Sequence, residues 1–211
     1  MRTHVYIDGF NLYYGAVKGT PYRWLDVARL CALLLPSHDI TAIRYFTARV
    51  KGTPSDPDQT IRQEVYLRAL RTLPGLTIHF GHFLQHPVSM PLAANPSQRV
   101  RVLKTEEKGS DVNLASHLLN DAHLGRFEAA VVVSNDSDLC EPIRIVRDEL
   151  GLGVGVLCPH QGQPKRRGRP SVMLRRLATF FKPIRVSVLQ ASQFPAGLAD
   201  MNGAFHKPVV W

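Results

Sequence analysis

The sequence has few cysteines and no long apolar run. Its 211 residues include three cysteines, Cys31, Cys140 and Cys158, which form neither a C-x-x-C pair nor an even-numbered framework. We therefore expect reduced thiols that fill the core, and a cytoplasmic protein. No apolar stretch approaches the roughly 20 residues that cross a bilayer, and residues 1–8 lack the apolar region of a secretory signal. These absences exclude a disulfide-stapled domain and predict that no membrane is involved.

The sequence also lacks internal repeats and long low-complexity tracts, and instead alternates apolar runs with amphipathic segments. Apolar runs predict strands at residues 4–8, 42–50, 76–84, 129–133, 154–157 and 184–189. Helical spacing predicts helices at residues 24–35, 58–72, 110–123, 139–150 and 172–181. Because strands that alternate with helices imply parallel crossovers, we predict one doubly wound α/β domain over residues 1–189.

Three segments fall outside this alternation. Residues 51–57 and 87–98 are rich in turn formers and are predicted to be loops at the rim of a substrate groove, the second leading into a basic strand at 99–104. Residues 190–211 show no regular pattern. We expect them to form a tail that packs on the domain or on a partner.

Four aspartates follow a predicted strand or open a predicted helix. Asp8 ends the first strand, Asp111 lies at the start of the helix at 110–123, and Asp136 and Asp138 follow the apolar run 129–133. A parallel α/β sheet brings such positions to one edge. Four ionised carboxylates there repel one another unless cations or protons neutralise them. Since Mg²⁺ and Mn²⁺ are the usual partners of such carboxylates, we predict that these four residues are both metal ligands and catalytic.

Neighbouring polar residues have two interpretations. Asn11 can hold Asp8 or a metal-bound water, Ser110 or Asn113 can steady the carboxylates, and Lys108 is near enough to meet a phosphate. Alternatively, the Ser, Asn and Asp residues of each segment only cap the helix that follows. One cap needs a single such residue, so the pair Asp136 and Asp138 exceeds what capping requires.

A positive charge of +9 at neutral pH is the second global signal. Such a surface attracts polyanions, among which nucleic acid is common, although basic proteins without nucleic-acid partners are also common. The densest basic run lies at 163–170, after the strand at 154–157, and either clamps a phosphate backbone or is a solvated loop. The predicted RNA-binding residues are Lys165, Arg166, Arg167 and Arg169, with Arg49 and Lys104 on the opposite wall. No aromatic RNP motif is present, so base-specific recognition is not expected.

Three segments together resemble the signature segments of NYN domains of the LabA and DUF88 type, within the PIN-like nuclease superfamily. They are residues 6–12 (YIDGFNL), 108–114 (KGSDVNL) and 133–139 (VSNDSDL), in the family's order. The resemblance implies a Rossmann-like, three-layer α/β/α fold with a central parallel sheet. It also implies Mg²⁺ or Mn²⁺ held by aspartates, cleavage of RNA, and supporting roles for Asn11 and Ser134.

The sequence departs from the family pattern at three positions. Many relatives have glycine in place of Asn135, phenylalanine in place of Leu139, and a further aspartate in place of His117. The first two changes lie beside the carboxylates and are expected to matter little. The third removes an acid and leaves the number of metal ions open.

We therefore predict a metal-dependent ribonuclease that hydrolyses phosphodiester bonds of RNA, and we expect that RNA to be single-stranded. The alternative is a non-catalytic RNA-binding or protein-binding module that keeps the PIN-like fold. A phosphatase with an aspartate nucleophile is disfavoured, because Phe10 stands where a second acid would be needed. The sequence leaves homo-oligomerisation open.

Overall fold

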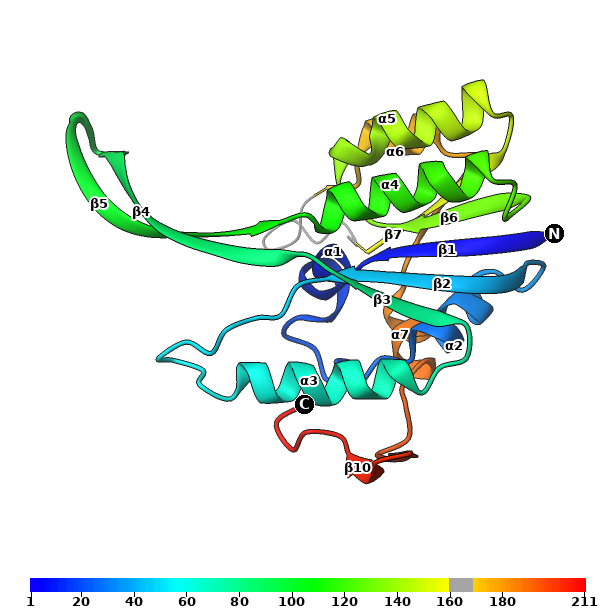
Figure 1. Cartoon of the computed structure of the whole chain (residues 1–211), viewed down its shortest axis with the longest axis horizontal. Helices are drawn as coiled ribbons and strands as arrows, with labels where there is room; N and C mark the ends of the chain where they lie inside the picture. The colour runs from blue at the N-terminus through cyan, green and yellow to red at the C-terminus, as the bar shows by residue number, and fades with distance from the viewer. Residues whose placement is uncertain (160–168) are drawn as a thin grey trace.

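A six-stranded parallel sheet forms the centre of the computed structural model, which describes residues 1–159 and 169–211. Its strand order is β3-β2-β1-β6-β7-β8, and all neighbouring pairs are parallel (Figure 1). The strands are β1 (Arg2–Asp8), β2 (Asp39–Thr47), β3 (Leu76–Phe80), β6 (Ala129–Val133), β7 (Gly153–Cys158) and β8 (Phe180–Pro183). The predicted α/β fold with a central parallel sheet is confirmed. The strand order reverses between β1 and β6, which is where ligands bind in open parallel sheets.

Helices cover both faces of this sheet. On one face lie α2 (Val27–Leu34), α3 (Gln59–Arg71) and α7 (Val186–Ala191), and on the other lie α4 (Ser110–His123), α5 (Cys140–Arg144) and α6 (Val172–Leu177). β1 serves both cores, because Val5 and Ile7 point to the first face and Tyr6 to the second. Four short helical segments lie beside these strands and helices: α1 (Gly9–Leu12) and η1 (Tyr13–Val17) follow β1, and η2 (Ser137–Leu139) and η3 (Ile145–Glu149) flank α5. No helix within the described ranges is long and apolar enough to cross a bilayer.

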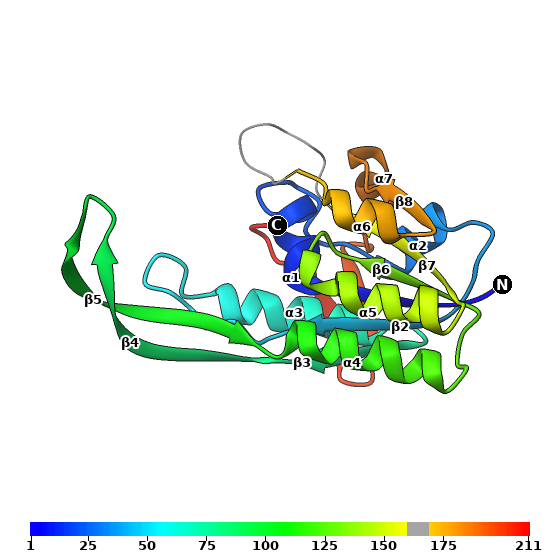
Figure 2. The same ribbon diagram turned by 90° about the horizontal axis from the view of Figure 1, so that it is seen from above.

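A long two-stranded arm extends from the body. β4 (His82–Leu92) pairs antiparallel with β5 (Asn95–Lys108), and Figures 1 and 2 show both strands reaching well past the sheet. The strand predicted at 76–84 is therefore broken at Gly81, and the loop predicted at 87–98 is wrong. Prolines suggested that loop, but a strand of a two-stranded ribbon has an open edge where a missing N–H costs little. The basic strand predicted at 99–104 is part of β5.

The elements near the carboxyl end differ from the prediction. The predicted helix at 172–181 ends at Leu177, and the strand expected at 184–189 is largely the helix α7. Val186 and Val188 favour a strand by propensity, but α7 packs against α2 and buries Leu189 in the core. Tertiary packing therefore overrides the local preference.

The last segment packs on the same face as α3. It forms a small hairpin of β9 (Gly197–Asp200) and β10 (Gly203–His206). Arg68 of α3 pairs with Asp200 at 2.7 Å, and the indole N–H of Trp24 donates to the carbonyl of Pro195 at 2.8 Å. The tail thus contributes to the core on the α3 face.

Candidate active site at the carboxyl edge of the sheet

Asp8 is a buried carboxylate at the end of β1, beside the end of β6. Its side chain is 4% exposed. The backbone N–H of Asn11 donates to one carboxylate oxygen at 2.9 Å, and the Ser134 hydroxyl donates to the other at 3.0 Å. Ile7 pairs with Val133 in register, so the two segments that follow these strands start side by side. Both oxygens of Asp8 are held by the predicted supporting residues.

The loop after β6 is organised by its own side chains. The N–H of Asp136 donates to the Ser134 hydroxyl at 3.1 Å, and the N–H of Asp138 donates to the Asp136 carboxylate at 2.9 Å. The N–H of Asn135 donates to the side-chain oxygen of Asn11 at 2.9 Å. Asp136 caps the following turn, as in the alternative interpretation, yet it also lines the cleft described below.

Asp111 lies in the first turn of α4, and the end of the arm fixes that turn. α4 begins after Gly109, whose φ of 97° lies in a region that favours glycine. At the end of β5, the carboxylate of Glu107 accepts hydrogen bonds from the Ser110 N–H at 3.1 Å and the Ser110 hydroxyl at 2.7 Å. The position of Asp111 therefore depends on the arm as well as on the sheet.

A cleft of about 350 Å³ brings most of these groups together. Three of the four predicted aspartates, Asp8, Asp111 and Asp136, line it together with Asn11. Asp138 is exposed and lies outside the lining, although its charge reaches Asp111. Glu107 adds another carboxylate, so the cleft is acidic although the whole chain is basic.

Burial and mutual repulsion raise the pKa values of these carboxyl groups. Burial, followed by the charges of Asp111 and Asp136, raises the pKa of Asp8 to about 7 despite the two hydrogen bonds that favour its charged form. The pKa of Asp111 is also raised, first by burial and then by Asp136, Glu107 and Asp138. At neutral pH, negative charge in the cleft is therefore costly unless a proton or a cation neutralises it.

The donor set of the cleft fits a hard divalent cation. Carboxylate oxygens are the ligands that Mg²⁺ and Mn²⁺ prefer. Within residues 1–159 and 169–211, no Lys, Arg or His forms an ion pair with Asp8, Asp111, Asp136 or Asp138. In the same ranges, no group of three or more acidic, His or Cys side chains is already arranged to hold a metal ion. A metal would thus require these side chains to close around it.

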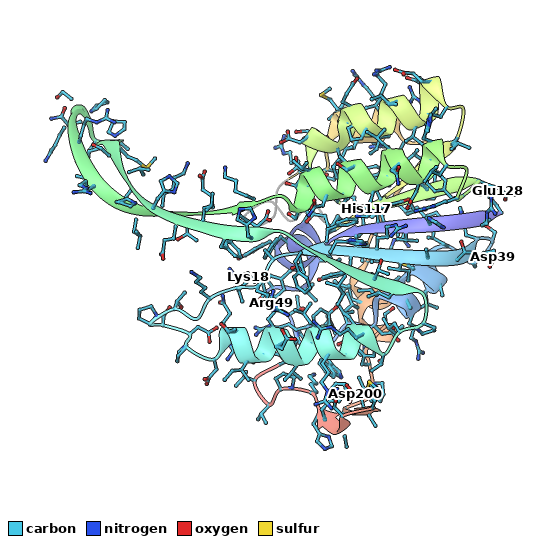
Figure 3. All side chains as sticks on the ribbon, in the orientation of Figure 1. Lys18, Asp39, Arg49, His117, Glu128 and Asp200 are labelled. Carbon is cyan, nitrogen blue, oxygen red and sulfur yellow. The ribbon has the colours of Figure 1, made fainter. Side chains whose placement is uncertain are left out.

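Two other candidate residues, Lys108 and Asn113, and the departure from the family pattern at His117 lie outside the cleft lining. The ammonium of the exposed Lys108 is 3.5 Å from Glu106, and the Asn113 amide donates to the carbonyl of Phe80 at 3.4 Å. His117, labelled in Figure 3, contacts the ring of His79 with centroids 4.1 Å apart. The family's additional acid would therefore project toward β3 and not into the cleft.

The predicted RNA-binding residues are only partly described. Lys165, Arg166 and Arg167 lie outside the described residues. Arg169 is exposed, and its carbonyl accepts a hydrogen bond from the Asn135 amide at 3.0 Å, which places the end of the basic run beside the aspartate loop. The other two predicted RNA-binding residues lie near the arm. Arg49 lines a cavity with Lys51 at the base of the arm, and Lys104 forms an ion pair with Glu106 at 2.5 Å.

Sequence reasoning missed several groups that line the cleft. The rings of Phe10 and Phe83 meet edge to face with centroids 5.8 Å apart, and Tyr14 lies beside them. Phe10 could have been found, because it lies two residues after Asp8 and next to a tight turn. Phe83 and Glu107 belong to the arm, which no local signal placed against the end of β1.

Comparisons with known proteins identify the family of the chain and a solved structure that shares its fold. The NYN domain model matches residues 2–171. A monooxygenase of Pseudomonas putida (strain DSM 28022 / S16), named 6-hydroxy-3-succinoylpyridine 3-monooxygenase HspA, is 33% identical over 190 residues, which cover 77% of this chain and 61% of that protein. The chain thus spans about three fifths of that relative. A protein of unknown function from Vibrio parahaemolyticus RIMD 2210633, VPA0982, shares the fold with a TM-score of 0.56 and 16% identity, covering 88% of this chain and 93% of that chain.

Proposed function

This chain belongs to the NYN domain family, within the PIN-like nuclease superfamily, and we propose that it is a metal-dependent ribonuclease that hydrolyses RNA phosphodiester bonds. The acidic cleft at the β1 and β6 ends carries the proposal. Its carboxylates have no cationic partner among the described residues, and burial raises the pKa of Asp8 to about 7. An arrangement that is costly to the free protein is typical of a binding site for cations.

The residues of the cleft have separate roles in this proposal. Asp8, Asp111, Asp136 and Asp138 would hold Mg²⁺ or Mn²⁺, which when bound polarises the phosphoryl group and lowers the pKa of the attacking water. Asn11 and Ser134 keep both oxygens of Asp8 in place.

Other groups act on the substrate. Lys108, directly after Glu107, contributes positive charge at the rim, and the products carry a 5′-phosphate and a 3′-hydroxyl. Arg49, Lys104 and the basic run from Lys165 to Arg169 would neutralise the backbone of single-stranded RNA.

Replacing Asp138 with Asn tests the proposal. This exposed residue lies outside the packed core, so the variant should fold, and it should retain RNA affinity because the basic groups remain. Cleavage of single-stranded RNA in Mn²⁺ should fall by at least a hundredfold. Asp39→Asn, the same change at the opposite end of the sheet, is the matched control and should cleave like the wild type (Figure 3). Normal cleavage by the Asp138 variant would refute the proposed site.

Two rival functions make different predictions from the nuclease. A non-catalytic RNA-binding or protein-binding module would bind RNA or protein without any Mn²⁺-dependent turnover. The 33% identity to a protein named as a monooxygenase favours a second activity, oxidation of a substituted pyridine. A monooxygenase consumes O₂ and a reductant, so oxygen uptake with that relative's named substrate, without RNA cleavage, would favour it over the nuclease.

A further inference from the structure

A second cavity of about 130 Å³ adjoins the acidic cleft. Phe10 and Tyr14 line both spaces, so the cavity and the cleft are neighbours. Aromatic side chains form part of its lining: Tyr13 from η1, Tyr45 from β2 and Tyr66 from α3, together with Trp211 from the tail. The volume is several times the roughly 30 Å³ share of one water in the liquid, and such walls suit a planar ring.

Arg23 is one of the polar side chains that line this cavity. The Nε atom of Arg23 is buried and forms no hydrogen bond among the described residues. Two other polar side chains of the lining are already engaged: the amide of Gln63 bonds the backbone of Ala48 and Val50, and Arg62 pairs with Asp56. A buried donor without an acceptor is unfavourable. Because Arg23 lines the cavity, its guanidinium can donate to a ligand there that presents an acceptor.

We propose that this cavity binds one nucleobase of the RNA strand whose phosphate occupies the acidic cleft. The inference rests on the proposed function and adds a substrate subsite to it. The base would stack on the tyrosine rings and accept a hydrogen bond from Arg23 through a carbonyl oxygen or a ring nitrogen. Selectivity for one base next to the cleaved bond would then come from this cavity, without the RNP motif that the sequence lacks.

Calorimetric titration with single nucleotides tests the subsite without requiring cleavage. The four nucleoside 5′-monophosphates at millimolar concentration should bind to different extents, and ribose 5-phosphate, which lacks the base, should bind at least tenfold more weakly. Arg23→Gln should weaken binding of the preferred nucleotide roughly tenfold, as expected for losing a charged donor. Arg29→Gln removes the same charge from an exposed position on α2 and is the matched control.

Tyr14→Ala is a second variant that keeps the test valid if Arg23→Gln does not fold. Tyr14 is 55% exposed, so its truncation should leave the core intact while weakening base stacking roughly 5- to 100-fold. Circular dichroism establishes that each variant is folded. Equal binding of ribose 5-phosphate and the nucleotides, or wild-type binding by both folded variants, would overturn the subsite. Binding of a pyridine carboxylate but of no nucleotide would also overturn it, and would assign the cavity to a free heterocycle.

The subsite and the nuclease can fail separately. If the wild type binds nucleotides as described but cleaves no RNA in Mn²⁺, the proposed function fails while the cavity remains a nucleobase site. If the wild type cleaves all four homopolymers at equal rates and binds no mononucleotide, the nuclease stands and the subsite is refuted.

Discussion

Replacing Asp136 with Asn should remove most of the stabilisation that Mn²⁺ gives to the native protein. The side-chain oxygen of the introduced asparagine can still accept the N–H of Asp138, so the loop should keep its shape. Burial still raises the pKa values of Asp8 and Asp111, but one of the charges that raise them further disappears, so the metal-free variant should be as stable as the wild type or more so.

The size of the metal effect follows from mass action. At a Mn²⁺ concentration 100 times its Kd, binding to the native state alone contributes about 2.7 kcal/mol. For a chain of this length, 1 kcal/mol shifts the melting temperature by about 2–4 °C, so the wild type should gain about 5–10 °C. Asp136→Asn should gain less than half of that, whereas the matched control Asp39→Asn should gain as much as the wild type.

The pH dependence gives the same prediction a second readout. The folded pKa of Asp8, about 7, lies above its unfolded value of 3.8, so the folded protein holds a proton that the unfolded chain releases. The contribution of Asp8 to the stability of the metal-free protein is therefore largest in acid and declines as the pH rises through 7. Because Mn²⁺ must displace this proton, its affinity at pH 6 should be about tenfold weaker than at pH 8.

Melting curves recorded by circular dichroism at pH 6 and pH 8, with and without Mn²⁺, measure the metal-dependent shift in melting temperature and its dependence on pH. A wild-type protein that shows no metal-dependent shift at pH 8 would refute the reasoning. An Asp136 variant that shifts as much as the Asp39 control would refute the assignment of that residue as a ligand.

Three further outcomes are expected. First, alanine should replace Lys165, Arg166, Arg167 and Arg169 together, and the slope of log affinity against log salt concentration for single-stranded RNA should fall by nearly 3 units. Each lost phosphate contact accounts for about 0.7 of this change, whatever the RNA sequence. An unchanged slope would show that the run is a solvated loop. Second, Asp121→Asn should lower the unfolding free energy measured by urea denaturation by about 3–5 kcal/mol. The reason is that the fully buried Asp121 accepts hydrogen bonds from Arg44 at 2.6 and 3.1 Å. A loss below 1 kcal/mol would contradict this. Third, burial and then the charge of His117 lower the pKa of His79 to about 4. The unfolding free energy should therefore fall as the pH drops from 6.5 toward 4, by up to about 2 kcal/mol at pH 5, and His79→Gln should reduce that fall. An unchanged pH profile in the variant would exclude His79 as the cause.

Much of the fold could be predicted from local sequence. The strand Ala129–Val133 and the helix Ser110–His123 have the predicted bounds, because an uninterrupted apolar run and a helical period are strong local signals. The arm could not be predicted in this way, since its prolines have the same local appearance in a loop and in an open-edged ribbon. α7 could not be predicted either, because its packing against α2 decides its conformation.

Part of the candidate site could likewise be predicted from local sequence, and part could not. Asp8 and Asp136 follow from the rule that parallel strand ends share an edge, which requires only the order of the elements. Asp111 opens the helix after β5, so its place in the cleft also depends on the arm. Glu107 and Phe83 reach the cleft through the arm, and Arg23 reaches the aromatic cavity from the segment before α2. These placements depend on contacts between distant segments, which short patterns do not encode.

The contact between the tail and the body has a spectroscopic consequence. The chain has two tryptophans, and their rings lie against each other, with the centroids of Trp24 and Trp211 6.4 Å apart. Trp24 is 1% exposed, and Tyr66 and Phe194 complete the cluster. All of the indole emission of the protein therefore originates at this one junction. Release of the tail should shift the emission to longer wavelength while the sheet stays intact, so the native chain carries its own optical probe of tail docking.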